Sequence, residues 1–152
     1  MIFERAGVLG VVVLPALLAL LAVGVGGCIS PTDPMGRQDA LENSQRDYTK
    51  LMRWGEMERA AEFVDPALRE AFLSYTEEFA AIRITDFDIG PIHYEADGSA
   101  RVSVTYHGYS VGTFLDRPIR EDQEWYREGR GNAWWVRPEI EGIVGALGAA
   151  AP

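Results

Sequence analysis

The chain has 152 residues, of which 47% are hydrophobic and 24% charged, and its formal net charge is −9. A chain of this length is expected to form one ordinary domain. Its apolar fraction excludes wholesale disorder, because enough surface can be buried to offset the conformational entropy lost on folding. The acidic balance argues against nucleic acid as a partner, since binding polyphosphate requires a basic surface.

The first 27 residues have the pattern of a targeting segment. Residues 6–27 carry no charge and follow one basic residue, Arg5. Such a run is typical of an export signal rather than of a domain core. It ends in Val25-Gly26-Gly27-Cys28, which resembles the lipobox of bacterial lipoproteins. The resemblance implies a signal peptide over 1–27 and a diacylglyceryl group on Cys28, which anchors the chain to a membrane of the bacterial envelope, facing the periplasm.

Two questions about this segment stay open. An uncleaved transmembrane helix is the alternative, since at about 1.5 Å per residue the run is long enough for a hydrocarbon core of about 30 Å. Pro15 and the glycines at 24, 26 and 27 make it a poorer permanent helix. Ile29 follows the cysteine where an aspartate is the commonest inner-membrane retention signal in enteric-type bacteria, so the resemblance favours the outer membrane. With Cys28 lipidated, no cysteine is left for a disulfide.

Residues 28–37 are predicted to form a tether and residues 38–140 one α+β domain. The tether is polar, contains prolines and shows no hydrophobic periodicity. Apolar residues then recur with helical spacing from Gln38 to Trp54, and Gly55 is expected to end that helix. A second, short helix is predicted over Glu56–Val64.

A third and longer helix is predicted after this point. It begins at Asp65-Pro66, which supplies an N-cap residue and a proline at the first helical position. The apolar residues that follow at helical spacing are Leu68, Phe72, Tyr75, Phe79 and Ile82. We expect one continuous helix with a single buried stripe.

From Ile84 onward the hydrophobic period changes to two, which predicts an antiparallel sheet for the rest of the domain. Asp97-Gly98 predicts a two-residue hairpin turn. That turn would place Asp88 directly opposite His107 on a polar face of the hairpin. Gly90-Pro91 predicts a bulge in the first of the two strands.

A second hairpin is predicted from Arg120–Arg127 and Ala133–Arg137. Trp134 and Trp135 are adjacent, and neighbouring side chains of a strand point to opposite faces, so we expect at least one of these tryptophans to lie outside the core. The tail over 141–152 has little to bury and is expected to be flexible.

Helices followed by antiparallel strands define an α+β class, with helices on one face of a curved sheet. The segment Tyr48–Glu56, followed by Ala60, Ala61 and Phe63, is similar to the start of nuclear-transport-factor-like domains, the cone-shaped superfamily that includes ketosteroid isomerases and polyketide cyclases. There, an aromatic residue on the first helix precedes a glycine-acid pair that starts the second. The resemblance covers roughly Gln38 to Pro138 and implies a cone-like fold, whereas activity varies within the superfamily.

The resemblance also implies a role for Tyr48. It falls where the isomerases place a tyrosine that donates a hydrogen bond to a developing oxyanion. Their catalytic carboxylate is missing from its expected place, and Asp86 is the candidate for a substitute base. Packing in the core is the alternative role of Tyr48. Tyr106, Trp125 and Trp135 are predicted, with Tyr48 and Asp86, to line a pocket or contact a ligand.

Two other polar groupings are interpreted as surface features. Asp88 and His107 would form a solvent-exposed pair. Glu121, Asp122 and Glu124 would form a solvated edge strand that resists aggregation. The two histidines, predicted on opposite faces, cannot supply a metal site. No Gly-x-Ser-x-Gly elbow or phosphate-binding loop occurs, so neither a serine hydrolase nor a nucleotide-binding protein is indicated. No cofactor is expected.

These patterns favour a non-catalytic lipoprotein whose acidic domain binds an envelope protein or a small apolar ligand. Two alternatives remain open. One is an enzyme of the isomerase, dehydratase or cyclase type with Tyr48 as hydrogen-bond donor. The other is a structural protein that forms a homodimer through its sheet. Metals, cofactors and nucleic acid are not among the expected partners.

Overall fold

The computed structural model describes residues 35–148 of the chain. The chain divides into two units, Met1–Gly36 and Arg37–Pro152, and the fold below is that of the second. The predicted signal peptide, Cys28 and most of the tether lie outside the described residues. Within 35–148, no helix is both long and apolar enough to cross a membrane.

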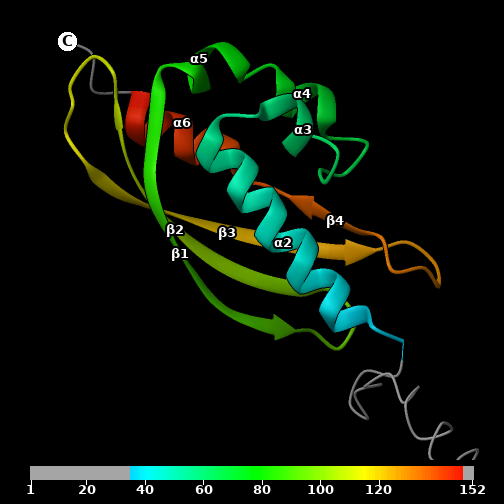
Figure 1. Ribbon diagram of the computed structural model, residues 1–152. Helices are drawn as coiled ribbons and strands as arrows, with labels where there is room; N and C mark the ends of the chain where they lie inside the picture. Colours follow the sequence, from blue (N-terminus) through cyan, green and yellow to red (C-terminus); the bar gives the residue numbers. More distant parts are fainter. Residues whose placement is uncertain (1–34, 149–152) are drawn as a thin grey trace, which may run out of the picture. The chain divides into compact units, whose positions relative to one another are not determined.

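The second unit is a mixed α+β structure in which helices pack on an open, four-stranded antiparallel sheet. The sheet contains β1 (Ile82–Tyr94), β2 (Ala100–Ser110), β3 (Arg117–Arg127) and β4 (Trp134–Arg137), which pair in chain order. Figure 1 shows the long strands curving beneath α2. The predicted α+β class and antiparallel sheet are confirmed.

The first described helix, α2 (Arg37–Trp54), lies across the inner face of the sheet. Its buried side chains recur at spacings of three and four residues, as expected for one face of a helix. They are Leu41, Gln45, Tyr48, Thr49 and Met52. Gly55 has φ of 71°, a left-handed conformation that glycine adopts without strain, and it ends the helix as predicted. The short helix α3 (Met57–Ala60) follows.

The prediction of one continuous third helix is wrong. The segment forms two short helices, α4 (Arg69–Leu73) and α5 (Thr76–Ala80). The hydroxyls of Ser74 and Thr76 donate hydrogen bonds to carbonyls of α4, at 2.6 and 2.7 Å. Side chains that bond the local backbone compete with helical hydrogen bonds, so the helix is interrupted between these two residues.

The predicted buried stripe is kept only in part. Phe72 and Phe79 are buried, but Leu68 is 38% exposed and Ile82 is the first residue of β1. Asp65 does cap the turn before α4, since its carboxylate accepts a hydrogen bond of 3.0 Å from the backbone N–H two residues on. Periodicity therefore identified the inward direction of this segment but not its break.

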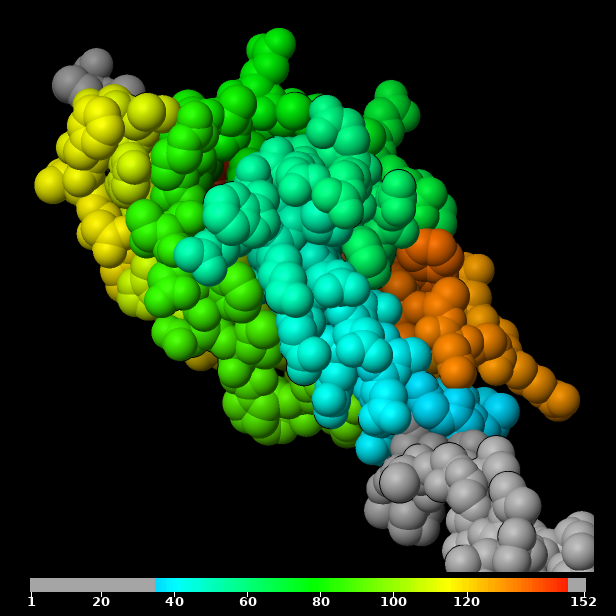
Figure 2. Space-filling view, viewed as in Figure 1, coloured from blue at the N-terminus to red at the C-terminus, as the bar shows by residue number. Residues whose placement is uncertain are grey.

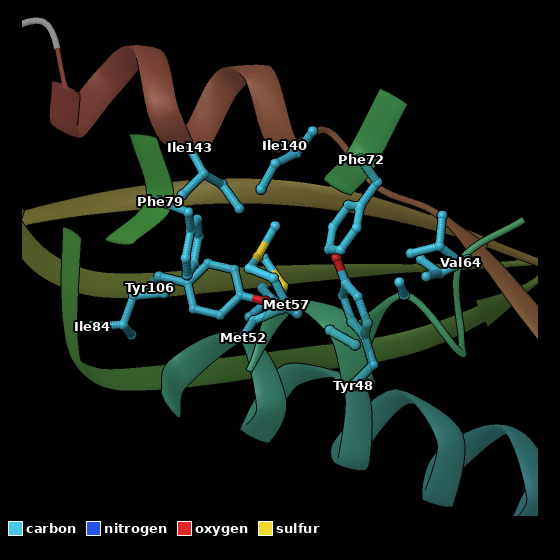
Figure 3. Packing of buried hydrophobic residues seen from close by; sticks show 14 of the residues in the cluster. Tyr48, Met52, Met57, Val64, Phe72, Phe79, Ile84, Tyr106, Ile140 and Ile143 are labelled. Atoms are coloured by element: carbon cyan, nitrogen blue, oxygen red, sulfur yellow. The ribbon is translucent and has the colours of Figure 1, made fainter. Parts of the chain in front are cut away.

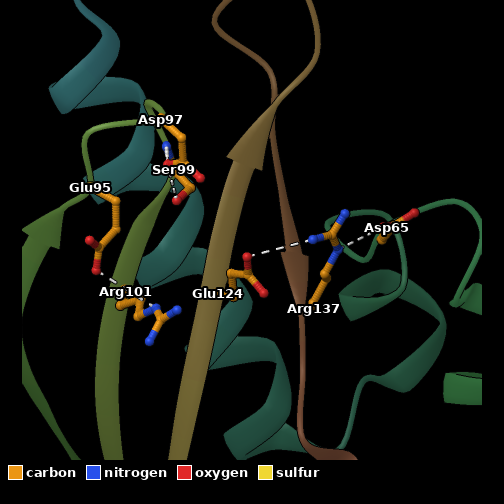
Figure 4. Close-up of polar contacts among 7 residues, drawn as sticks. All are labelled: Asp65, Glu95, Asp97, Ser99, Arg101, Glu124 and Arg137. Carbon is orange, nitrogen blue, oxygen red and sulfur yellow. Dashed lines mark hydrogen bonds and ion pairs between the residues drawn. The ribbon is translucent and has the colours of Figure 1, made fainter.

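The β1–β2 hairpin turns at Asp97-Gly98, as predicted, but through a loop one residue longer. The backbone N–H of Glu95 donates to the carbonyl of Ser99 at 2.9 Å. Gly98 has φ of 86°, so the connection is a turn followed by a left-handed glycine, the usual three-residue hairpin. The Asp97 carboxylate accepts hydrogen bonds from the backbone N–H and hydroxyl of Ser99 and stiffens the loop (Figure 4).

The longer loop and two bulges change the register of this hairpin. The predicted irregularity at Gly90-Pro91 is confirmed, and a second one occurs at Thr85. Asp86, rather than Asp88, is therefore the Cα partner of His107. The register expected from a two-residue turn is wrong for this reason.

The tryptophan-rich hairpin of β3 and β4 is confirmed. Trp134 is 4% exposed, and its indole N–H donates to the carbonyl of Arg37 at 3.0 Å, which joins this hairpin to the start of α2. Trp135 points to the opposite face, is only half-buried and lies beneath the guanidinium of Arg69. The expectation that one of the two tryptophans lies outside the core is confirmed.

The expectation of a flexible tail over 141–152 is wrong for its described part. Helix α6 (Ile140–Gly148) packs against β2 and β3. Ile140, Ile143 and Leu147 lie three and four residues apart and are buried. Two glycines and an alanine among them weaken this periodicity in the sequence.

The core lies between the helices and the inner face of the sheet. Figure 3 shows side chains from α2, α3, α6 and the sheet meeting in this space. They include Tyr48, Met52, Met57, Val64, Phe72, Phe79, Ile84, Tyr106, Ile140 and Ile143. Every residue of this core lies within Arg37–Pro152, so this unit contains a complete hydrophobic core.

Candidate functional site

The inner face of the sheet carries a buried polar network. β2 contributes Tyr106, and β3 contributes Glu121, Gln123 and Trp125, each at most 1% exposed. Because side chains alternate across a strand, the three β3 residues, at intervals of two, share one face. A charged residue is almost never buried this completely unless it is paired.

Hydrogen bonds join these side chains. Glu121 Oε2 accepts from the Tyr106 hydroxyl at 3.1 Å and from Gln123 Nε2 at 2.8 Å. Gln123 Oε1 accepts from the indole N–H of Trp125 at 3.1 Å and from Gln45 Nε2 of α2 at 3.4 Å. The network therefore ties the first helix to the middle of the sheet and uses both ends of the Gln123 amide.

Two buried oxygens in this network, Glu121 Oε1 and the Tyr48 hydroxyl, form no well-aligned hydrogen bond among the described residues. The Tyr48 hydroxyl nevertheless lies close enough to the Glu121 carboxyl to interact with it. The Tyr48 ring packs edge-on against Trp125 at 5.9 Å and against Phe72 at 6.5 Å. Figure 3 shows the hydroxyl pointing toward Phe72. Buried polar groups in folded proteins are nearly always hydrogen-bonded, so this pair of atoms calls for an explanation.

Burial controls the protonation of the network. Burial raises the pKa of the Glu121 carboxyl, although hydrogen bonds from Gln123 and Tyr106 oppose the rise. Burial, followed by the nearby Glu121 charge, raises the pKa of both Tyr48 and Tyr106 well above the ordinary tyrosine value. Both tyrosines therefore keep their protons at neutral pH and remain hydrogen-bond donors.

A cleft of about 560 Å³ lies next to this network, between α4 with its flanking residues and the start of α6. Its floor includes Phe72 and Ile140, and Glu139 and Glu141 supply carboxylates at its edge. Phe72 contacts Tyr48, and the backbone N–H of Glu139 faces the Glu121 carboxyl. The Tyr48 hydroxyl and the Glu121 carboxyl thus each lie behind a residue that lines the cleft.

The structure brings together three of the residues predicted to contact a ligand. Tyr48, Tyr106 and Trp125 meet in the core, whereas Trp135 lies on the opposite face of the sheet. Asp86 is exposed on that outer face, and one of its oxygens accepts the backbone N–H of the next residue. Its interpretation as a base that serves Tyr48 is wrong. Cys28 lies outside the described residues.

The interpretation of Glu121 as part of a solvated edge strand is also wrong. β3 pairs with β2 along most of its length and with β4 at its end, and Glu121 is fully buried. The signal that identifies it is alternation, because Trp125 in the core places positions 123 and 121 on the same face. Asp122 and Glu124 do lie on the outer face, where they are 59% and 43% exposed.

The outer side of the sheet carries several ion pairs, most of them exposed (Figure 4). Arg101 lies 3.7 Å from Glu95, and Arg137 lies 3.5 Å from Glu124 and 3.2 Å from Asp65. His107 and Asp88 form a further contact of 3.6 Å, with the Asp88 side chain 84% exposed, which confirms its interpretation as a surface pair. No group of three or more potential metal ligands gathers within residues 35–148.

Comparison with known proteins does not identify a family. No known protein family and no curated protein matches the chain. A solved structure of a protein from Catenulispora acidiphila aligns over 70% of this chain and 94% of its own, with a TM-score of 0.43 and 11% identity. A similarity at this level carries no argument about family or function. The described unit is defined as an α+β protein with an open antiparallel sheet and a buried polar network.

Proposed function

We propose that the chain is a lipid-anchored protein of the bacterial envelope whose α+β domain is a non-catalytic binding module. Its ligand is a small apolar molecule with one polar group. The observation that carries this proposal is the pair of buried polar groups behind the wall of the cleft, the Tyr48 hydroxyl and the Glu121 carboxyl, each with one oxygen that has no well-aligned hydrogen bond. A ligand group that both donates and accepts a hydrogen bond, such as a hydroxyl, would pair with both atoms.

The surroundings of the cleft support a neutral, apolar ligand. Phe72 and Ile140 supply apolar surface, and clefts of this size are typical of small-molecule sites. The carboxylates of Glu139 and Glu141 disfavour an anionic ligand through charge repulsion. To reach the buried oxygens, the polar end of the ligand displaces the Phe72 ring, which separates Tyr48 from the cleft.

The cleft is tested with N-phenyl-1-naphthylamine, a neutral apolar dye that fluoresces when it leaves water. The Arg37–Pro152 unit, checked for folding by circular dichroism, is titrated with the dye. Ala71→Trp, within the cleft, should fill the space and abolish binding. Ala80→Trp is the matched control, since Ala80 is also an exposed alanine on a neighbouring helix but does not line the cleft. Equal dye binding by both variants would contradict the proposal.

The anchor is tested separately in the full chain. When the chain is expressed in a bacterial host that is fed labelled palmitate, the protein should incorporate the label and lose residues 1–27. Cys28→Ala should remove the label and leave the chain uncleaved. An unlabelled, full-length wild-type protein in the membrane would instead support the transmembrane alternative. Separation of the two membranes by density then tests the outer-membrane assignment.

We also infer that the domain is nuclear-transport-factor-like. Three features support this: the long first helix within the curve of the sheet, the glycine that ends it, and the inward aromatic residue Tyr48. The buried hydroxyl of Tyr48 beside the Glu121 carboxyl favours, as a second candidate, an isomerase, dehydratase or cyclase type of enzyme. In that case Tyr48→Phe would abolish turnover without unfolding the protein, whereas a binding module has no turnover to lose.

A homodimer through the sheet is the remaining alternative. The outer face that such a dimer would bury carries Arg101, Arg137 and their acidic partners, and burying ion pairs is costly unless they are well paired. Sedimentation of the Arg37–Pro152 unit tests this alternative. A monomer at high concentration would exclude it.

A further inference from the structure

A second site lies on the outer side of α2 and α3, away from the cleft. Trp54, the last residue of α2, is 71% exposed. It lines a groove of about 430 Å³ together with charged side chains. These are Asp47, Lys50, Glu56, Arg59 and Glu62. Figure 2 shows the outer side of α2 open to solvent on this face of the molecule.

The Trp54 ring is held in place although it is exposed. The guanidinium of Arg53 packs over it, 5.5 Å from the ring centroid, and lies 5.9 Å from the centroid of Phe87. Arg53 also donates a hydrogen bond of 2.7 Å to the carbonyl of Thr85 on β1. Trp54 lines the groove and Arg53 does not, so the indole is exposed to a ligand there while Arg53 packs against it. The groove therefore offers a flat aromatic surface that is held in position before any ligand binds.

The charges of the groove are nearly balanced. Lys50 lies 3.9 Å from Asp47, and Arg59 pairs with Glu56, so both cations already have an acidic partner within the groove. Glu62 adds one further carboxylate. A balanced set of donors and acceptors favours a neutral, hydroxyl-rich ligand over a strongly charged one. The electron-rich face of an indole also attracts the C–H groups on the face of a sugar ring.

We infer that this groove binds a neutral glycan, with one sugar ring stacked on Trp54. A glycan of the cell wall is the natural source, a step that rests on the proposed envelope location. Binding of a soluble glycan does not depend on the lipid anchor or on the cleft. A failure of the glycan proposal can therefore be told apart from a failure of the anchor or cleft proposals.

The test uses chitotriose, a trimer of N-acetylglucosamine, added to the ¹⁵N-labelled Arg37–Pro152 unit. The four tryptophans give four indole N–H signals. Those of Trp125 and Trp134 come from buried, hydrogen-bonded indoles and serve as internal references. The signal of Trp54 should shift, while the two reference signals stay in place.

Two variants test whether chitotriose binds in the groove. Trp54→Ala should weaken binding by about tenfold or more, as is typical for the loss of an aromatic contact at the centre of a site. Phe114→Ala is the control, because Phe114 is similarly exposed, at 69%, but lies outside the groove. The inference is overturned if chitotriose leaves the Trp54 signal unmoved, if Trp54→Ala binds equally well, or if only a basic peptide such as trilysine moves that signal.

Discussion

Glu121 and Asp122 are neighbours on β3 with the same acidic chemistry, and the structure treats them in opposite ways. Glu121 points inward, is fully buried, and has a pKa raised by burial. Asp122 points outward, and hydrogen bonds from Ser103 and Arg120 lower its pKa. One step along the strand thus separates a carboxyl whose pKa is raised by burial from one whose pKa is lowered by hydrogen bonds. We expect substitutions on the inner face to change stability and binding far more than those on the outer face.

The buried and the solvent-facing sides of the tryptophan hairpin offer the largest contrast. Trp125→Ala should lower the free energy of unfolding by about 3–5 kcal/mol, because a fully buried aromatic ring leaves a cavity. Trp135→Ala, on the outer face, should cost about 1 kcal/mol or less. Urea denaturation measures both. Similar losses for the two variants would mean that the faces are not distinguished by burial.

The Gln123 amide is expected to have the next largest effect. Gln123→Ala removes the acceptor of the Trp125 indole and a donor to Glu121, and leaves both groups buried. Leaving these buried groups without hydrogen-bond partners should lower the free energy of unfolding by about 1–3 kcal/mol in total. Thermal unfolding checks this, with Asp122→Asn on the outer face as control. A loss no larger than that of the control would contradict the network.

Replacing each of the two buried tyrosines by phenylalanine should change the free energy of unfolding in opposite directions. Tyr106→Phe removes a hydrogen bond to Glu121 and should destabilise the fold by about 1 kcal/mol. Tyr48→Phe removes a buried hydroxyl that makes no well-aligned hydrogen bond and only a poorly aligned contact with Glu121, and it should stabilise the ligand-free fold by about 1 kcal/mol. The same variant should weaken ligand binding. If Tyr48→Phe instead destabilises the protein, its hydroxyl already has a partner in the free protein and the binding argument fails.

The smallest expected effect is on the pH dependence of stability, which should differ between Glu121 and Asp122. The pKa of Glu121 is raised in the folded state. Its contribution to the free energy of unfolding is therefore fully present below the ordinary value near 4.5 and is lost as pH rises through the raised pKa. Asp122 has a lowered pKa, so its contribution is present above its ordinary value near 3.8 and is lost as pH falls through the folded pKa.

Variants of the two carboxyls isolate these effects in chemical denaturation at a series of pH values. Glu121→Gln should remove the decline at higher pH. Asp122→Asn should affect only the acidic side, by less than about 1 kcal/mol, because the group is exposed to solvent. An unchanged decline in Glu121→Gln would show that another group causes it.

Local patterns were sufficient to predict much of the fold. Helical spacing and Gly55 predicted α2 and its end, and the change of period predicted the antiparallel sheet. The break between α4 and α5 was not predicted, since it depends on serine and threonine hydroxyls that compete for backbone carbonyls. Helix α6 was missed because two glycines and an alanine lie among its three buried residues and weaken the helical pattern.

Only the aromatic residues of the candidate site could be predicted from the sequence. Tyr48, Tyr106 and Trp125 were selected as candidate contacts, and the structure places them together. Glu121 was assigned to the surface because its acidic neighbours suggested a solvated strand, although alternation from Trp125 places it inside. The unpaired oxygens were beyond prediction, since they depend on the distances between side chains from α2 and β3 rather than on any local pattern.

The central claim is that the ligand enters by the cleft over the inner face of the sheet. Nuclear Overhauser effects between N-phenyl-1-naphthylamine and the methyl groups of the Arg37–Pro152 unit test it most directly. We expect contacts to Leu68, Ala71 and Ile140, which line the cleft. Contacts only to the exposed apolar residues Val111 and Leu115, or an absence of any bound dye, would contradict the claim.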